Sequence, residues 1–406
     1  MEMVLEFLRD VLSQPALLIG IMSCIGLIAL KRPFHKIMTG TLKPILGYLM
    51  LAAGAGVIVS NLDPLGKMIE HGFHITGVVP NNEAIVAVAQ KVLGVETMSI
   101  LVVGLLMNLC IARFTKFKYV FLTGHHSLFM ACLMSAVLGT AGLSGMELIL
   151  VGGFLMGAWS AISPAIGQSY TSKVTDGDEI AIGHFGSLGY YLSAWVAKYV
   201  GKAEDSTEDI EIPEKWGFLR DSTLSTALTM IVFYLIAAFA AGSEFVSTLS
   251  GEMSPYLYAV MSAMNFAVGV TIVYSGVRMI LGDLIPAFQG IATKIIPNAI
   301  PAVDCAVFFT YAPTAVVLGF LSSFIGGIIG MLILGAVGGV LIIPGLVPHF
   351  FCGATAGIYG NATGGRRGAA VGAFLNGLAI TFLPALALPV LGQLGFQNTT
   401  FGDADF

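Results

Sequence analysis

Long apolar runs separated by short polar turns fill most of the 406-residue chain. A helix needs about 17–25 mostly apolar residues to cross the hydrocarbon core of a bilayer. Runs of about this length predict some ten spanning segments, and the chain is therefore expected to be an all-α polytopic membrane protein. The approximate ranges are 15–31, 43–61, 98–113, 119–139, 145–163, 223–243, 256–281, 303–327, 328–348 and 368–392.

The composition agrees with this fold class and excludes several classes of function. Hydrophobic residues make up 56% of the chain and charged residues 11%, whereas soluble domains carry roughly 25% charged residues. The net charge of −5 is thinly spread and includes no basic stripe, which argues against nucleic-acid binding. No nucleotide-binding glycine motif and no metal-ligand spacing is present. We therefore expect neither a cofactor nor a metal.

Basic residues gather in the turns, and this sets the expected orientation. They lie at 31–43, at 113–118, in the segment 171–222 and at Arg366-Arg367. Because cytoplasmic loops are enriched in Lys and Arg, these four places are expected inside and the N-terminus outside. Five spans in each half would then give the two halves opposite orientations.

The two halves, residues 1–222 and 223–406, resemble each other weakly. Inverted repeats with interrupted segments at matching positions indicate a transporter whose site lies at the repeat interface; chance similarity between glycine-rich helices is the alternative. The acidic segment between the halves is expected to be a solvated cytoplasmic linker, or else a docking site for a soluble partner. The matching elements are Pro64 with Pro286, Pro80-Asn81 with Pro297-Asn298, the strings 145–164 and 330–348, and the polar stretches 182–186 and 359–365, which carry His184 and Asn361.

The stretch 297–314 is the main interruption, because three prolines break an apolar region around Asp304. A carboxylate at membrane depth is costly unless it is paired or faces a water-filled cavity. Broken helices at that depth are buried in protein or line a cavity. Asp304 is therefore the first candidate for a substrate site, as a hydroxyl acceptor or a general base. A structural pair with Arg278 is the alternative.

Five further polar residues are weaker candidates. His125 and His126 point roughly 100° apart on a helix, so one of them, His125 by preference, is expected to face a cavity; an interfacial histidine is the alternative. His184 ends a segment that looks re-entrant, although a loop position would also explain it. Asn82 and Glu83 follow Pro80, in the part of the first half that corresponds to the broken stretch. A position in a loop would explain them equally well.

Several strings of the chain match a known family in order and spacing: Leu122–His125, Val174–Gly177 with Ile182–His184, Ala302–Ala306 with Ala312–Val317, and Leu341–Gly345. Over nearly its whole length the chain resembles the ascorbate-specific membrane component (enzyme IIC) of the bacterial phosphoenolpyruvate-dependent sugar phosphotransferase system. The resemblance implies a homodimer in the cytoplasmic membrane. It also implies inverted repeats with re-entrant helices, a scaffold ("V-motif") domain and a mobile core domain that moves like an elevator.

The resemblance further implies a reaction and its partners. The permease would bind ascorbate, and a phosphocysteine on a soluble IIB component, recharged by IIA, would convert it to ascorbate 6-phosphate. The phosphoryl-carrying cysteine then lies on a separate subunit. The family's ligand positions match His125, His184 and Asp304, and less firmly Asn82 and Glu83; the rest of the first motif is formed by His126 to Phe129.

The chain departs from the family in two respects. Members that take ascorbate carry glutamine four residues after the first motif histidine and directly after the second, where this chain has Phe129 and Phe185. A related sugar or sugar acid is therefore as consistent as ascorbate. The family also continues into one more span beyond Phe406. The alternative function is a proton-coupled secondary transporter of a sugar acid, without phosphotransfer, that uses Asp304 or a histidine.

Overall fold

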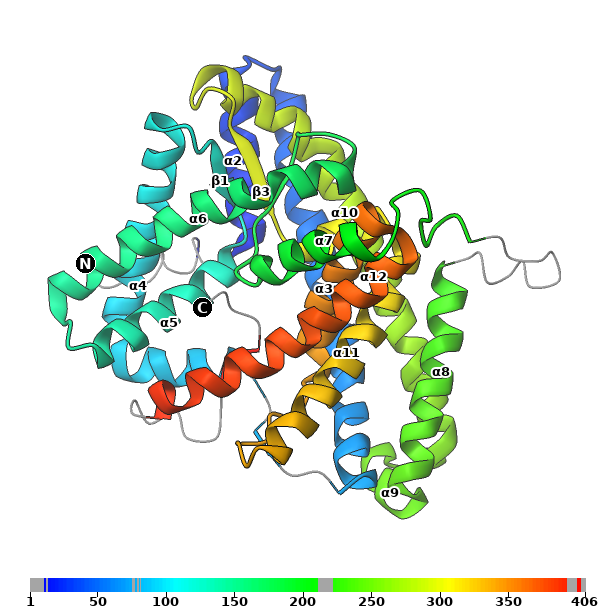
Figure 1. The fold of residues 1–406 in the computed structure, drawn as a ribbon. Helices are drawn as coiled ribbons and strands as arrows, with labels where there is room; N and C mark the ends of the chain where they lie inside the picture. Colours follow the sequence, from blue (N-terminus) through cyan, green and yellow to red (C-terminus); the bar gives the residue numbers. More distant parts are fainter. Residues whose placement is uncertain are drawn as a thin grey trace.

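The computed structural model describes residues 11, 14–74, 77, 78, 80, 82–210, 222–392 and 400–402. It consists mainly of long helices (Figure 1). The elements are α2 (Pro15–Ala29), α3 (Phe34–Gly72), α4 (Asn82–Phe114), β1 (Tyr119–Phe121), α5 (Gly124–Thr140), α6 (Gly145–Thr175), β2 (Ala181–Ile182), α7 (Ser187–Val200), α8 (Ser222–Ala241), α9 (Ser243–Ser250), α10 (Pro255–Lys294), β3 (Ile300–Val303), the 3-10 helix η2 (Cys305–Thr310), α11 (Pro313–Ala336) and α12 (Leu346–Gly392).

Six helices in the described part of the chain are long and apolar enough to cross a membrane, and the bent pair α8–α9 could add a seventh. The polytopic membrane class is confirmed, but not every expected run forms a single long helix in the described part of the chain. The run 119–139 opens with a strand, and the helix α5 that follows has 17 residues. The run 328–348 is not one helix, because α11 ends at Ala336 and Gly338 adopts a positive φ of 73°.

The all-α prediction also misses a three-stranded parallel sheet with the order β1-β3-β2. In β1 and β3, Tyr119 pairs with Ile300 and Phe121 with Ala302. In β2, Ala181 pairs with the same Ala302. The central strand contains Pro301, which has no N–H to donate. The proline is tolerated because β2 begins at the level of the following residue.

The helices fall into two packing groups. The first contains α2, α3, α8, α9 and α10, and the second contains α4–α7, α11 and α12. In Figure 1, α4–α6 lie on the left, α8 and α9 on the right, and α3, α10, α11 and α12 between them. The sheet and η2 lie where the groups meet, since both β3 and η2 contact α10 while η2 also contacts α12.

The long helices α3 and α10 run antiparallel and approach each other at glycines. A Cβ on Gly47 would lie 2.9 Å from the carbonyl oxygen of Gly276, and one on Gly54 would lie 2.8 Å from that of Gly269. Small residues let helix backbones approach this closely in a membrane. The contacts are reciprocal, because 47 and 54 lie 222 residues before 269 and 276, the same offset as Pro64 to Pro286.

Another part of the internal similarity has no structural counterpart. The string 145–164 lies entirely on α6. Its proposed mate, 330–348, runs from the end of α11 through a loop, where Ile342 bridges to Val78, into α12. The shared glycine and proline pattern therefore occurs in a continuous helix in the first half and in a helix–loop–helix in the second.

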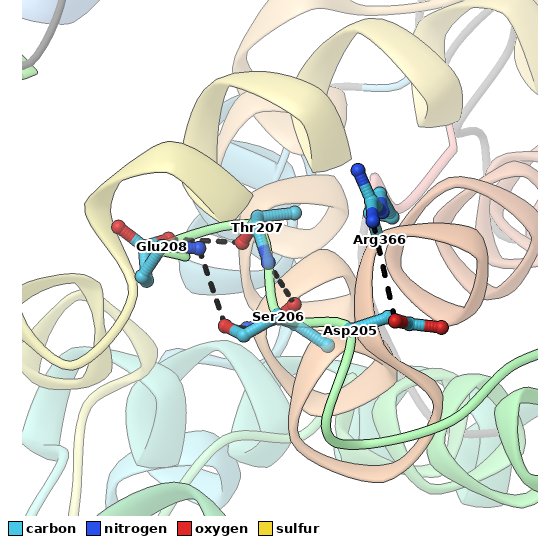
Figure 2. A network of polar contacts seen from close by, with 6 residues as sticks. Asp205, Ser206, Thr207, Glu208 and Arg366 are labelled. Atoms are coloured by element: carbon cyan, nitrogen blue, oxygen red, sulfur yellow. Dashed lines mark hydrogen bonds and ion pairs between the residues drawn. The ribbon is translucent and has the colours of Figure 1, made fainter. Parts of the chain in front are cut away.

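The acidic segment after α7 is not simply solvated, because residues 205–208 are fixed to α11 and α12 (Figure 2). The buried amide of Thr207 donates to the side chain of Asn361 at 2.8 Å. The carbonyl of Asp205 accepts from the Arg366 amide at 2.8 Å. These two bonds hold the segment at the kink of α12, where Gly364 and Gly365 leave the helical conformation.

Glu208 closes the segment by capping α11. Its carboxylate accepts from the Thr314 amide at 3.0 Å, the Thr314 hydroxyl at 2.9 Å and the Ala315 amide at 3.1 Å. An anion at a helix N-terminus satisfies donors that have no partner within the helix and opposes the positive end of the helix dipole.

Replacing Glu208 by alanine should therefore lower the free energy of unfolding by about 1–2 kcal/mol, the usual loss for a removed cap. Thermal unfolding in detergent measures this. Glu204→Ala is the matched control, because Glu204 is an exposed acid in the same segment. Equal melting temperatures for the two variants would contradict the capping role.

Candidate functional site

The ends of the three strands bring the candidate residues together. The strands are parallel, so their carboxyl ends lie at one edge of the sheet. The pairing extends past β1 and β2, since the Leu122 amide donates to the Ala302 carbonyl at 2.9 Å and the Gly183 amide to the Val303 carbonyl at 2.7 Å. The next row of the register therefore contains Thr123, Asp304 and Gly183, in the spatial order β1-β3-β2. We call this the carboxyl edge.

Asp304 occupies the centre of the carboxyl edge and is only 7% exposed. Its carboxylate accepts from the Ala306 amide at 3.1 Å, which starts η2. On α3, the Tyr48 phenol lies within electrostatic range of the Asp304 charge. The acid is therefore enclosed by protein rather than by lipid, as a functional carboxylate at membrane depth requires.

The alternative of an ion pair between Asp304 and Arg278 finds no support in the described residues. Arg278 is exposed on α10. Asp283, also on α10, lies 3.7 Å from Lys43 of α3. This pair joins the two long helices.

His184 follows β2 and is 1% exposed. Its Nδ1 accepts from the Gly186 amide at 2.9 Å and lies 3.1 Å from the Tyr190 hydroxyl. Because a backbone N–H can only donate, Nδ1 carries no proton, and in the neutral ring the proton is on Nε2. His184 is thus oriented as a donor through Nε2.

The neighbour of His184 at this edge is His126, with 3.8 Å between ring centroids. His126 is buried in the first turns of α5. The sequence favoured His125; its backbone lies in the same first turn, but its side chain is outside the described part. The described geometry therefore brings His126 to the edge, and the role of His125 stays a prediction.

Asn82 and Glu83 begin α4, and their side chains also lie outside the described part of the structure. The expectation that they bind substrate accordingly stays a prediction. Other polar residues have structural roles that the sequence did not indicate. Gln168 donates to the Ile180 carbonyl at 3.2 Å just before β2, and Asn361 anchors the linker by accepting from the Thr207 amide.

The two phenylalanines that replace the family's glutamines differ in their surroundings. Phe129 is half-buried and meets the His126 ring edge-on, with centroids 5.7 Å apart. Phe185 is 2% exposed and stacks on Phe121 of β1 at 4.7 Å. Phe129 therefore contacts a polar side chain of the site, whereas Phe185 packs among the apolar side chains that support the sheet.

Sequence reasoning missed Tyr190, whose hydroxyl lies 3.1 Å from Nδ1 of His184, and Tyr48, which lies near Asp304. Tyr190 comes six residues after His184, and no motif links the two; the first turn of α7 brings its hydroxyl back to the imidazole. Tyr48 lies on α3, far from Asp304 in sequence. The edge as a whole presents a carboxylate acceptor and an imidazole donor in buried surroundings, a combination suited to binding a polyhydroxylated molecule.

Comparisons with known proteins agree with this chemistry. A family model described as the PTS system sugar-specific permease component matches residues 10–405. A curated protein from Mycoplasma pneumoniae (strain ATCC 29342 / M129 / Subtype 1), described as an ascorbate-specific PTS system EIIC component, is 28% identical over 417 residues. The alignment covers 88% of this chain and 62% of that relative, so the chain spans less than two thirds of its length.

Proposed function

Because the chain belongs to the family of sugar-specific permease components of the phosphotransferase system, we propose that it binds ascorbate or a related sugar or sugar acid at the carboxyl edge and carries it across the cytoplasmic membrane. A phosphocysteine on a soluble IIB partner, recharged by IIA, then phosphorylates the substrate. The observation that supports this proposal is that three parallel strands end beside Asp304 and that His184, which follows one of them, contacts His126.

Each residue at the edge has a proposed role. Asp304 accepts a hydrogen bond from the hydroxyl that will be phosphorylated, and acts as its base. His184, with its proton on Nε2, donates to a substrate oxygen, and His126 or His125 donates from the α5 side. Asn82 and Glu83 complete the ligand set. Since phosphoryl transfer depends mostly on positioning and charge stabilisation, orienting the hydroxyl is the permease's main contribution.

The proposed movement follows the two packing groups. The group α2, α3, α8, α9 and α10 forms the scaffold, and the group α4–α7, α11 and α12 forms the core that moves like an elevator. The reciprocal glycine contacts of α3 and α10 support inverted repeats at residues 1–222 and 223–406, because a two-fold axis makes contacts reciprocal in this way. The protein is proposed to be a homodimer with its N-terminus outside.

Uptake by proteoliposomes tests the function. With IIB, IIA and a phosphoryl donor inside, labelled ascorbate or a related sugar acid should accumulate only as its phosphate ester. Vesicles without IIB should not accumulate substrate against its gradient. Accumulation of the unmodified substrate driven by a proton gradient would overturn phosphotransfer in favour of a secondary transporter.

Phe129 is expected to limit affinity for ascorbate. Phe129→Gln places an amide beside the His126 ring and should raise the affinity by about two- to tenfold, the value of one hydrogen bond. Phe185→Gln instead buries an amide against Phe121 and should lower the melting temperature without tightening binding. Calorimetric titration of both variants measures the difference, and equal affinities of Phe129→Gln and wild type would contradict it.

A further inference from the structure

Thr123 has a buried hydroxyl that the fold does not use. The residue is 1% exposed, and its Oγ1 has no hydrogen-bond partner among the residues that the structure describes. It stands at the N-cap of α5, where a threonine normally accepts from an amide of the first turn, yet its side chain makes no cap bond.

This situation differs from that of other buried threonines in the chain. Thr363 donates to the Ala194 carbonyl at 2.9 Å, and Thr381 donates to the Gly377 carbonyl at 2.8 Å. A buried hydroxyl without a partner loses its hydration and gains nothing in return. The fold therefore tolerates at Thr123, as it also does at Thr41 and Ser163, a cost that it avoids at Thr363 and Thr381.

The register places this hydroxyl at the carboxyl edge. Continuing the β1–β3 pairing from Phe121 and Ala302 by two residues sets Thr123 opposite Asp304. The hydrogen bond from the Leu122 amide to the Ala302 carbonyl closes the Phe121–Ala302 pair, directly before Thr123. Adjacent strands lie about 4.8 Å apart, and paired residues of parallel strands project to the same face.

We propose that Thr123 is a further substrate ligand, whose Oγ1 hydrogen-bonds an oxygen of the sugar or sugar acid next to the hydroxyl that Asp304 accepts. The inference rests on the proposed function and adds a residue to it. A threonine hydroxyl both donates and accepts, so it suits a ligand that carries neighbouring hydroxyl groups. Bound substrate would supply a hydrogen-bond partner that the described residues do not offer to this hydroxyl.

The test compares Thr123→Val, which keeps the shape and removes the hydroxyl, with Thr123→Ser, which keeps the hydroxyl. Purified full-length variants are titrated with ascorbate and the related sugar acids, and each is also melted without ligand. Thr123→Val should bind about tenfold more weakly, whereas Thr123→Ser should stay within about threefold of wild type. Without ligand, Thr123→Val should melt at the same temperature as wild type or higher.

Thr381→Val is the matched control, because its hydroxyl bonds within its own helix; its affinity should not change. A Thr123→Val protein that binds as wild type does, or that melts lower without ligand while Thr123→Ser does not, overturns the ligand role. The second result would show that the hydroxyl has a structural partner. A wild-type protein that binds none of the compounds overturns the proposed function itself, and the ligand role with it.

Discussion

An Asp304→Asn protein should lose phosphorylation-coupled uptake by about two to four orders of magnitude, the usual contribution of a positioned acid or base. The asparagine side chain can still accept from the Ala306 amide through its oxygen, so η2 should keep its start. The charge and the ability to take a proton are what disappear. Accumulation of labelled phosphate ester in proteoliposomes measures the effect.

A control variant tests whether removing any carboxylate from the helices has the same effect on uptake. Asp283→Asn removes a carboxylate that pairs with Lys43 at the contact of the long helices, and it should leave uptake nearly unchanged. Near-normal coupled uptake by Asp304→Asn, in a protein that expresses as well as wild type, would remove Asp304 from the mechanism.

A Gly365→Ala protein should fail to reach the native fold or should melt far below wild type. Gly365 has φ 60° and ψ −155°, a region open essentially to glycine alone and costing about 1–3 kcal/mol for other residues. A Cβ there would also collide with the carbonyl oxygens of Lys202 and Asp205. The clash forces the linker away from the kink of α12.

Gly338→Ala is the matched control, because Gly338 also has a positive φ, of 73°, but a Cβ there meets nothing within 4 Å. Its free energy of unfolding should fall only by the conformational cost of the positive φ, about 1–2 kcal/mol. Detergent-solubilised yield and melting temperature measure both. Similar losses for the two glycines would show that the linker contact contributes little.

Part of this architecture could be predicted from residue patterns. The cost of a carboxylate in an apolar region singled out Asp304, and its enclosure by η2 and the sheet agrees with that reasoning. The sheet itself escaped prediction, because β2 has two residues and β1 three, too few for a period of two to be recognised. Its two pairings join segments about 180 and 120 residues apart in the chain.

The choice between neighbouring histidines shows a second limit. The angle of about 100° between successive helical residues says that His125 and His126 face differently, but not which direction leads to the site. That direction is set by how α5 packs against the other helices. Acidic composition likewise predicted a solvated linker. The capping role of Glu208 depends on how the chain folds, because Thr314 at the start of α11 is 106 residues away in the sequence.

The strand order β1-β3-β2 has a consequence for how the molecule can move. The central strand comes from the second half of the chain, and both flanking strands come from the first. The two halves are thus interleaved at the place where the ligand is proposed to sit. If the proposed elevator carries this place across the bilayer, its rigid body must contain pieces of both halves, so the proposed repeats and the proposed moving unit would divide the chain at different points.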